Sequence, residues 1–204
     1  QAINAFEEVA AKNLPDGYRF EWTGMTFQEI KAGNMAIYAF AFALIFIYLF
    51  LVAQYESWSM PLAIILVVPI AAAGAVGGLL LTGIAFNLYA QIGLVLLIGM
   101  AAKNAILIVE FASNLREQEG KPIAEAAREA AHLRFRAVNM TAISFIIGIL
   151  PLVFASGAGM FGQKSLGIPV FFGMLAALVV GTFFIPGFYV IVQSLREKLK
   201  GKAS

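Results

Sequence analysis

The sequence contains no cysteine and only one histidine. Without cysteine there is no disulfide, thiolate ligand or thiolate nucleophile, and His132 alone cannot form a multi-histidine site, so we expect no metal. The phosphate-binding pattern G-x-x-x-x-G-K-[ST] and the hydrolase patterns H-E-x-x-H and G-x-S-x-G are also absent. We therefore expect neither an enzyme with catalytic residues nor an ATP-driven pump domain, and no cofactor. Energy would have to come from an ion gradient.

Charge is scarce as well. Charged residues make up 13% of the chain, hydrophobic residues make up 61%, and the mean hydropathy is +0.85. These values indicate an integral membrane protein rather than a soluble one. The formal net charge is only +2, and the 14 basic residues lie in particular loops rather than clustered on one face. We therefore expect contact with a lipid membrane and no nucleic-acid partner.

The start of the chain lacks a methionine and an insertion signal, so we expect a part of a longer protein. Between Ala2 and Leu14 apolar residues recur at helical spacing, and Tyr18 to Trp22 alternate as a half-buried strand does. One helix and one strand cannot bury a core alone. We predict that residues 1–32 are a short α/β remnant of a larger subdomain, followed by a connector.

Residues 33–204 are predicted to form an all-α polytopic membrane domain. Five apolar stretches approach or exceed the roughly 20 residues that a helix needs to cross hydrocarbon. A short surface helix is predicted at residues 122–133, with a solvated connector as the alternative. The predicted spans are residues 35–53, 60–81, 88–112, 137–155 and 166–192.

The short loops predict the orientation of these spans. The loop 113–136 and the tail after residue 192 carry most of the lysine and arginine of the membrane domain. Cytoplasmic loops carry an excess of these residues, so both regions are predicted to be cytoplasmic. Five crossings then place residues 1–32 on the opposite side.

Lys103 is the most informative charged residue. It follows the likely outer end of the third span by about fourteen residues, which corresponds to a depth of about 20 Å. A charge inside the membrane costs roughly 2.5 kcal/mol or more, so it normally faces the protein interior, has a partner and marks an ion path. The alternative is snorkelling, for which the inner boundary is too distant.

Other polar residues near Lys103 or on the fourth span each allow a functional and a structural interpretation. Asn104 could orient the ammonium, and Glu110, seven residues further on, could bind a proton or simply be solvated at the boundary. The fourth span opens with polar residues that could serve a proton path, the positive-inside rule or their own helix backbone. These residues are Arg134, Arg136, Asn139, Thr141 and Ser144. None of the acidic residues sits at mid-membrane, so a proton-accepting carboxylate is expected from outside these residues.

The run G-M-A-A-K-N-A-I-L-I-V-E-F-A at residues 99–112 closely resembles a signature of resistance-nodulation-division (RND) efflux pumps, in the hydrophobe/amphiphile branch. The chain departs from the family at Ala137, where proline is usual, and in a bulkier loop at 160–164. Neither departure removes a relay residue. Further patterns in the family's order are W-T-G-M at 22–25, Q-Y-E-S-W-S-M-P at 54–61, L-R-F-R at 133–136, M-T at 140–141, G-I-L-P-L-V at 148–153 and G-A-G at 157–159.

The resemblance implies the end of the second porter region, followed by the eighth to twelfth transmembrane helices of a twelve-helix protomer in the bacterial inner membrane. It implies a proton-driven antiporter that exports amphiphilic compounds such as antibiotics. Such pumps are homotrimers that work with a periplasmic adaptor and an outer-membrane channel.

The resemblance also implies a proton relay and names its members. The relay would consist of Lys103, Thr141, Arg134 and Asn104, facing an aspartate pair in the remaining N-terminal half, and Glu110 and Asn139 are candidates for supporting roles. Two alternatives stay open, namely a non-transporting membrane fragment or assembly piece and an RND exporter of a metal ion, lipid or protein. The Lys103-Asn104 signature favours the drug branch.

Overall fold

The computed structural model describes residues 2–15, 17–32 and 35–201, and the regular secondary structure of these residues is helical, without a strand. The chain divides into two compact units, Gln1–Met35 and Ala36–Ser204.

The first unit contains helix α1 (Ala2–Asn13), as the helical spacing predicts, and helix α2 (Gly24–Ala32). The predicted strand at residues 18–22 is not formed. Phe20 and Trp22 instead fold back on α1, with ring centroids 5.5 and 5.2 Å from that of Phe6. A strand is held by backbone hydrogen bonds to a neighbouring strand, and the described residues supply none. The α/β character of this unit is therefore not shown.

The core of the first unit is small. Ala10 is its buried hydrophobic residue among those described, while Phe6 remains 53% exposed and Phe20 37% exposed. Trp22 Nε1 donates a hydrogen bond of 3.2 Å to Glu7 Oε1 on α1. A cluster of this size cannot stabilise a domain by burial alone.

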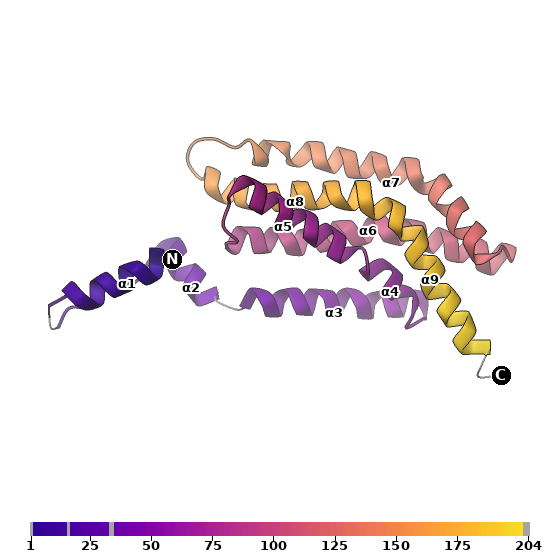
Figure 1. Ribbon diagram of the computed structural model, residues 1–204, viewed down its shortest axis with the longest axis horizontal. Helices are drawn as coiled ribbons and strands as arrows, with labels where there is room; N and C mark the ends of the chain where they lie inside the picture. The colour runs from indigo at the N-terminus through magenta and orange to yellow at the C-terminus, as the bar shows by residue number, and fades with distance from the viewer. Residues whose placement is uncertain (1, 16, 33–34, 202–204) are drawn as a thin grey trace. The chain divides into compact units, whose positions relative to one another are not determined.

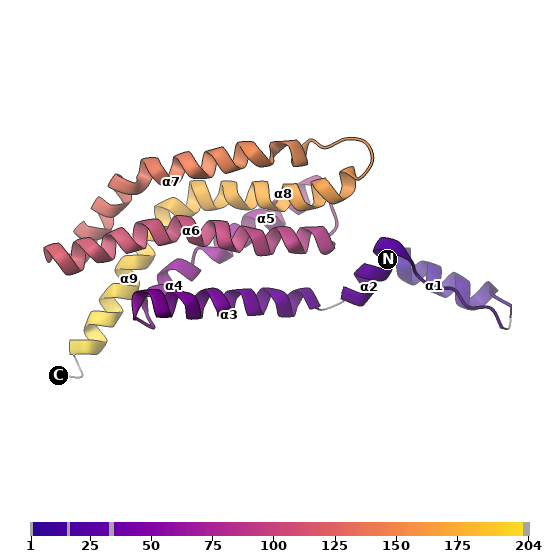
Figure 2. The same ribbon diagram turned by 180° about the vertical axis from the view of Figure 1, so that it is seen from behind.

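The second unit confirms the predicted all-α fold, because five helical segments of the described chain are long and apolar enough to cross a membrane (Figures 1 and 2). The first two agree closely with the predicted bounds, while the last three are longer than predicted. The segments are α3 (Met35–Tyr55), α4 (Met60–Ile65) with α5 (Val68–Thr82), α6 (Leu88–Glu119), α7 (Ile123–Val153), and α8 (Met160–Ala176) with the π-helix η1 (Ala177–Gly181) and α9 (Thr182–Gly201).

Differences from the predicted bounds have local causes. Residues 122–133 do not form a helix of their own, since no residue after Ile123 interrupts helix α7 before Val153. The fifth segment begins at Met160 rather than at residue 166, so the stretch 160–164 is helical rather than a loop. Pro69 lies in the first turn of α5, where its missing N–H costs least, and the helix breaks just before it.

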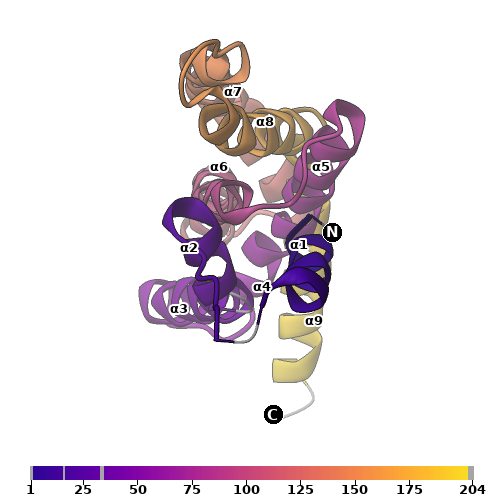
Figure 3. The same cartoon turned by 90° about the vertical axis from the view of Figure 1, so that its left-hand side faces the viewer.

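Helix α6 lies at the centre of the packing and contacts α4, α5, α7, α8 and α9 (Figure 3). It is capped at its start by Asn87, whose side chain accepts a 3.0 Å hydrogen bond from Ala90 N, and at its end by Gly120 in the left-handed conformation, φ +67°. Gly120 leads directly into α7, so α6 and α7 run antiparallel (Figure 1). We call this end of the bundle the Gly120 end.

Small residues allow close helix contacts on one face of α6. A Cβ at Gly93 would lie 2.9 Å from the carbonyl oxygen of Leu166 and 3.1 Å from a methyl of Val170, both on α8. On α5, a Cβ at Gly78 would lie 2.5 Å from the ring of Phe172, also on α8. These glycines serve helix packing within this chain.

The opposite side of α6 is open. Helix α3 is mostly exposed, and Leu51 is its buried residue among the side chains described. Between the two helices lies an apolar groove of about 270 Å³, lined by Phe46, Phe50, Gly99 and Ile106 among others. This open side carries Lys103.

Candidate functional site

One stripe of α6 carries the charged residues that the sequence singles out. Gly99, Lys103 and Glu110 are separated by four and seven residues, so they lie on one side of the helix, and all three are exposed. No atom outside its own helix lies within 4 Å of a Cβ built at Gly99. We call these three residues the outer stripe.

Lys103 has no ion pair or hydrogen-bond partner among the described residues. Glu110 lies about 10 Å further along the axis, too far for a direct ion pair with Lys103. It also forms no ion pair in the described part of the chain.

Asn104 lies in a different environment from its neighbour Lys103. Successive residues of a helix point about 100° apart, and Asn104 is turned into the bundle with 4% of its surface exposed. Its Nδ2 is buried and has no hydrogen-bond partner. The structure therefore does not bring Asn104 to the ammonium of Lys103.

Thr141 and Ser144 on α7 are exposed, and both hydroxyls donate to their own helix. Thr141 Oγ1 donates to the Val138 carbonyl at 3.0 Å, and Ser144 Oγ donates to the Met140 carbonyl at 2.8 Å. A hydroxyl that donates to the backbone keeps its lone pairs as acceptors. Thr141 can still accept a hydrogen bond from an ammonium group.

Arg134 lies over an aromatic ring. Its Cζ lies 4.4 Å from the ring centroid of Phe111 on α6, and its Nε is buried without a hydrogen-bond partner. Arg136 is exposed and Asn139 is half-buried, and no ion pair or hydrogen bond joins either of them to Arg134 in the described chain.

The Arg134–Phe111 contact marks the register of α6 against α7. Lys103 precedes Phe111 by eight residues and Thr141 follows Arg134 by seven. Because the helices run antiparallel, both steps lead in the same direction, by about 12 Å and about 10.5 Å. Lys103 and Thr141 therefore lie at nearly the same depth, although no hydrogen bond between the two is formed among the described residues.

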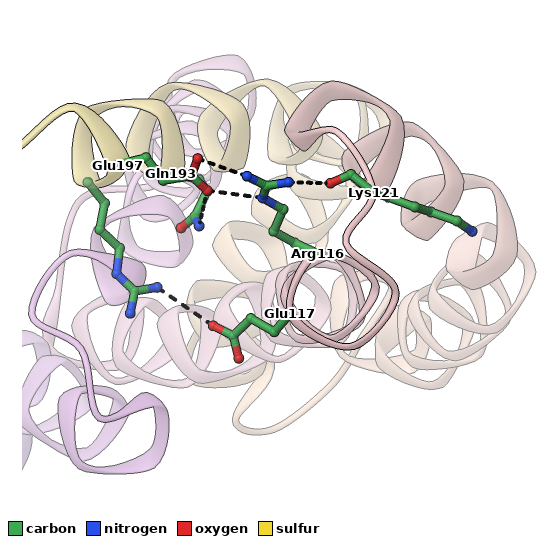
Figure 4. Close-up of polar contacts among 6 residues, drawn as sticks. Arg116, Glu117, Lys121, Gln193 and Glu197 are labelled. Carbon is green, nitrogen blue, oxygen red and sulfur yellow. Dashed lines mark hydrogen bonds and ion pairs between the residues drawn. The ribbon is translucent and has the colours of Figure 1, made fainter. Parts of the chain in front are cut away.

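The Gly120 end holds a second set of charges, and these are paired (Figure 4). Arg116 on α6 donates two hydrogen bonds of 3.0 Å to the carboxylate of Glu197 on α9, and a third of 2.8 Å to the Lys121 carbonyl. Gln193 Nε2 donates to the same carboxylate at 3.0 Å. This bidentate arrangement ties α6, α9 and the turn into α7 together, and we call it the Arg116 clasp.

Further ion pairs surround the clasp. Arg196 on α9 lies 3.8 Å from Glu117 on α6. Lys121 Nζ lies 2.8 Å from Glu119 and 2.5 Å from Glu129. The hydrogen bond to Glu119 raises the pKa of Lys121 above its ordinary range most, and the hydrogen bond to Glu129 raises it further.

Sequence reasoning did not find the Phe111–Arg134 contact or the Arg116 clasp. Each joins side chains of two different helices: Phe111 and Arg134 lie on the consecutive helices α6 and α7, and Arg116 and Glu197 are separated by 81 residues. The sequence offered only a local signal for these residues. Each lies near the end of an apolar stretch, where charged residues are common and do not indicate a contact. Within the described residues, no three histidine, cysteine or acidic side chains gather as metal ligands.

Comparison with known proteins gives consistent matches. Multidrug resistance protein MdtF of Escherichia coli (strain K12) is 43% identical over 199 residues, which cover 98% of this chain and 19% of MdtF. The solvent-resistant pump membrane transporter SrpB of Pseudomonas putida is 45% identical over 198 residues, covering 97% and 19%. The toluene efflux pump membrane transporter TtgB, also of Pseudomonas putida, is 45% identical over 195 residues, covering 96% and 18%.

The chain thus spans about a fifth of the length of these relatives. A family model described as the AcrB/AcrD/AcrF family matches residues 1–193, which is nearly the whole chain. The chain, with its outer stripe and its five apolar helical segments, therefore belongs to the AcrB/AcrD/AcrF family.

Proposed function

We propose that this chain is the C-terminal membrane part of a proton-driven efflux transporter that exports amphiphilic small molecules. The names of the relatives describe a multidrug resistance protein, a solvent-resistant pump and a toluene efflux pump, and their identity to this chain supports the same class of cargo. No chemical reaction on the cargo is part of the proposal. The driving force is a proton gradient, and no cofactor is required.

One observation carries this proposal. Lys103 is a cation without a partner among the described residues, on a helix long and apolar enough to cross a membrane, at the depth of an available hydroxyl. Such a charge is too costly to be left without a partner in hydrocarbon. The chain spans only 19% of the length of MdtF. A carboxylate from the part of the complete protein outside this chain can therefore approach the outer stripe and pair with Lys103. The exposed side of α6 and the groove beside α3 leave room for it.

The chemistry follows from charge balance. While the partner carboxylate is ionised, it attracts the Lys103 ammonium. When it takes up a proton this attraction disappears, and the ammonium gains from a neutral acceptor such as Thr141. The two states place Lys103 differently, so α6 and α7 shift relative to the partner, and Arg134 guides the proton from the boundary.

The orientation is part of the same proposal. The Gly120 end and the basic tail face the cytoplasm of a bacterial inner membrane, because both carry the excess of lysine and arginine. Residues 1–32 then lie on the periplasmic side. We further propose that this chain and the N-terminal half of the pump form one protomer. Three protomers form a homotrimer, which works with a periplasmic adaptor and an outer-membrane channel.

The test is export of a fluorescent amphiphile from cells that produce the complete protein, with equal membrane amounts verified. Lys103→Ala is expected to reduce proton-dependent export at least about tenfold, since it removes the cation on which the two states depend. Lys164→Ala on α8, outside the outer stripe, is the control and is expected to keep export. Unchanged export in Lys103→Ala would contradict the proposed relay.

A further inference from the structure

We propose that Phe111 is a positioning residue for Arg134, holding its guanidinium at the edge between α6 and α7 by a cation–π contact. This inference rests on the proposed function, because it assigns Phe111 a role in the proton route through Arg134.

The contact is specific in its geometry. The guanidinium carbon lies 4.4 Å from the ring centroid, well within the range of a cation–π interaction. Phe111 is itself half-buried and packs against the core cluster that contains Ile108 and Ala130, so the ring is held in place. The ring therefore sets the position of Arg134 rather than following it.

Arg134 lacks the partners that usually hold an arginine. Its Nε is buried without a hydrogen-bond acceptor, and no ion pair in the described chain includes it. Arg134 is half-buried, and a partly desolvated cation without a carboxylate gains more from an aromatic face than a fully solvated one does, because the ring competes with less water. The ring face thus replaces the missing counter-ion.

The nature of this support suits a proton route. A carboxylate partner would neutralise Arg134 and could itself take up a proton. An aromatic ring does neither, so Arg134 keeps its full positive charge and its remaining N–H donors. Phe111 also lies on the same helix as Lys103, two turns away, so a shift of α6 carries Arg134 with it.

The first test compares ring-preserving and ring-deleting variants of the complete protein. Phe111→Leu is expected to lower the maximal export rate by about three- to tenfold without changing the KM for the amphiphile. Phe111→Tyr is expected to keep more than about half of the rate, because it retains the ring face. Phe111→Trp serves if the tyrosine variant accumulates poorly.

Phe145→Leu is the matched control. Phe145 is a half-buried phenylalanine on α7 that packs against another core cluster, with no cation over its ring among the described contacts. Its loss removes a similar amount of apolar surface and is expected to leave the export rate near that of the wild type. An equal loss in Phe145→Leu and Phe111→Leu, or in Phe111→Leu and both ring-preserving variants, would overturn the positioning role.

A second test measures the contact without relying on export. Thermal unfolding midpoints of the wild type, Phe111→Leu, Arg134→Gln and the double variant form a cycle that isolates the pair. We expect the double variant to lose less than the sum of the two single losses, and additive losses would overturn the contact. If Lys103→Ala retains export while this cycle shows coupling, the relay fails and the contact stands, so the two failures are distinguishable.

Discussion

Two regions of helix α6 carry charge in opposite ways. At the Gly120 end, Arg116 donates three hydrogen bonds to two other parts of the chain. On the outer stripe, Lys103 has no such partner among the described residues. A charge that is satisfied within the chain stabilises the fold, whereas a charge that is left open requires a partner from elsewhere and can respond to it.

The same contrast separates the glycines of this helix. A Cβ at Gly93 would meet the backbone of α8, while the surroundings of Gly99 are open. One face of α6 is therefore committed to packing within this chain, and the other is available to the rest of the protein.

After the loss of Lys103 itself, the largest expected effect belongs to the hydroxyl of Thr141, which lies at nearly the same depth. Thr141→Val in the complete protein should lower export more than about tenfold, because it removes the neutral acceptor for Lys103. Thr141→Ser keeps the hydroxyl and should retain export. Ser144→Ala is the matched control, since its hydroxyl makes the same kind of bond to its own helix, and losses of equal size at both positions would contradict the assignment.

The next effect is on folding. Gly93→Ala is expected to destabilise the complete protein by about 1–2 kcal/mol, because overpacking outweighs the gain in helix propensity. Gly99→Ala, on the same helix, should change stability by less than about 0.5 kcal/mol. Thermal unfolding of the two variants measures the difference, and equal losses would show that the outer stripe is packed as tightly as the inner face.

A smaller effect is expected at the Arg116 clasp. Arg116→Ala should lower the thermal midpoint because Glu197 loses both hydrogen bonds from the guanidinium. Exchanging the pair, Arg116→Glu with Glu197→Arg, should restore part of the loss. Export per folded molecule should stay close to wild type, and a large drop there would assign the clasp to the transport cycle instead.

The smallest effect concerns Lys121. Its pKa is raised by Glu119 and Glu129, so its contribution to stability is complete below its unfolded pKa of about 10.4 and is lost as the pH rises through the folded value. Lys121→Met should therefore lower the thermal midpoint slightly at about pH 8, and the difference from the wild type should shrink towards about pH 11. A difference that grows with pH would contradict the assigned sign.

The sequence predicts much of this fold because the membrane demands long apolar helices. Hydropathy alone located all five segments, and helical spacing located α1. It failed at residues 18–22, where alternation is a local signal but a strand needs a partner from elsewhere. It also separated residues 122–133 from the fourth span, although no helix-breaking residue divides them.

The sequence predicted which residues belong to the candidate site but not how they are arranged. The cost of an intramembrane charge singled out Lys103, but the sequence could not show which side of α6 it faces or that Asn104 turns inward. The depth of Thr141 relative to Lys103 depends on the register between α6 and α7, which the contact of Phe111 with Arg134 marks. Such register is a property of packing, not of either helix alone.

The most direct measurement is transport by the complete protein in liposomes with an imposed pH gradient, comparing the wild type, Lys103→Ala and Arg116→Ala. We expect Lys103→Ala to abolish gradient-driven transport while it stays folded, and Arg116→Ala to transport in proportion to its folded amount. Gradient-driven transport by Lys103→Ala at the wild-type rate would show that Lys103 does not couple protons to transport.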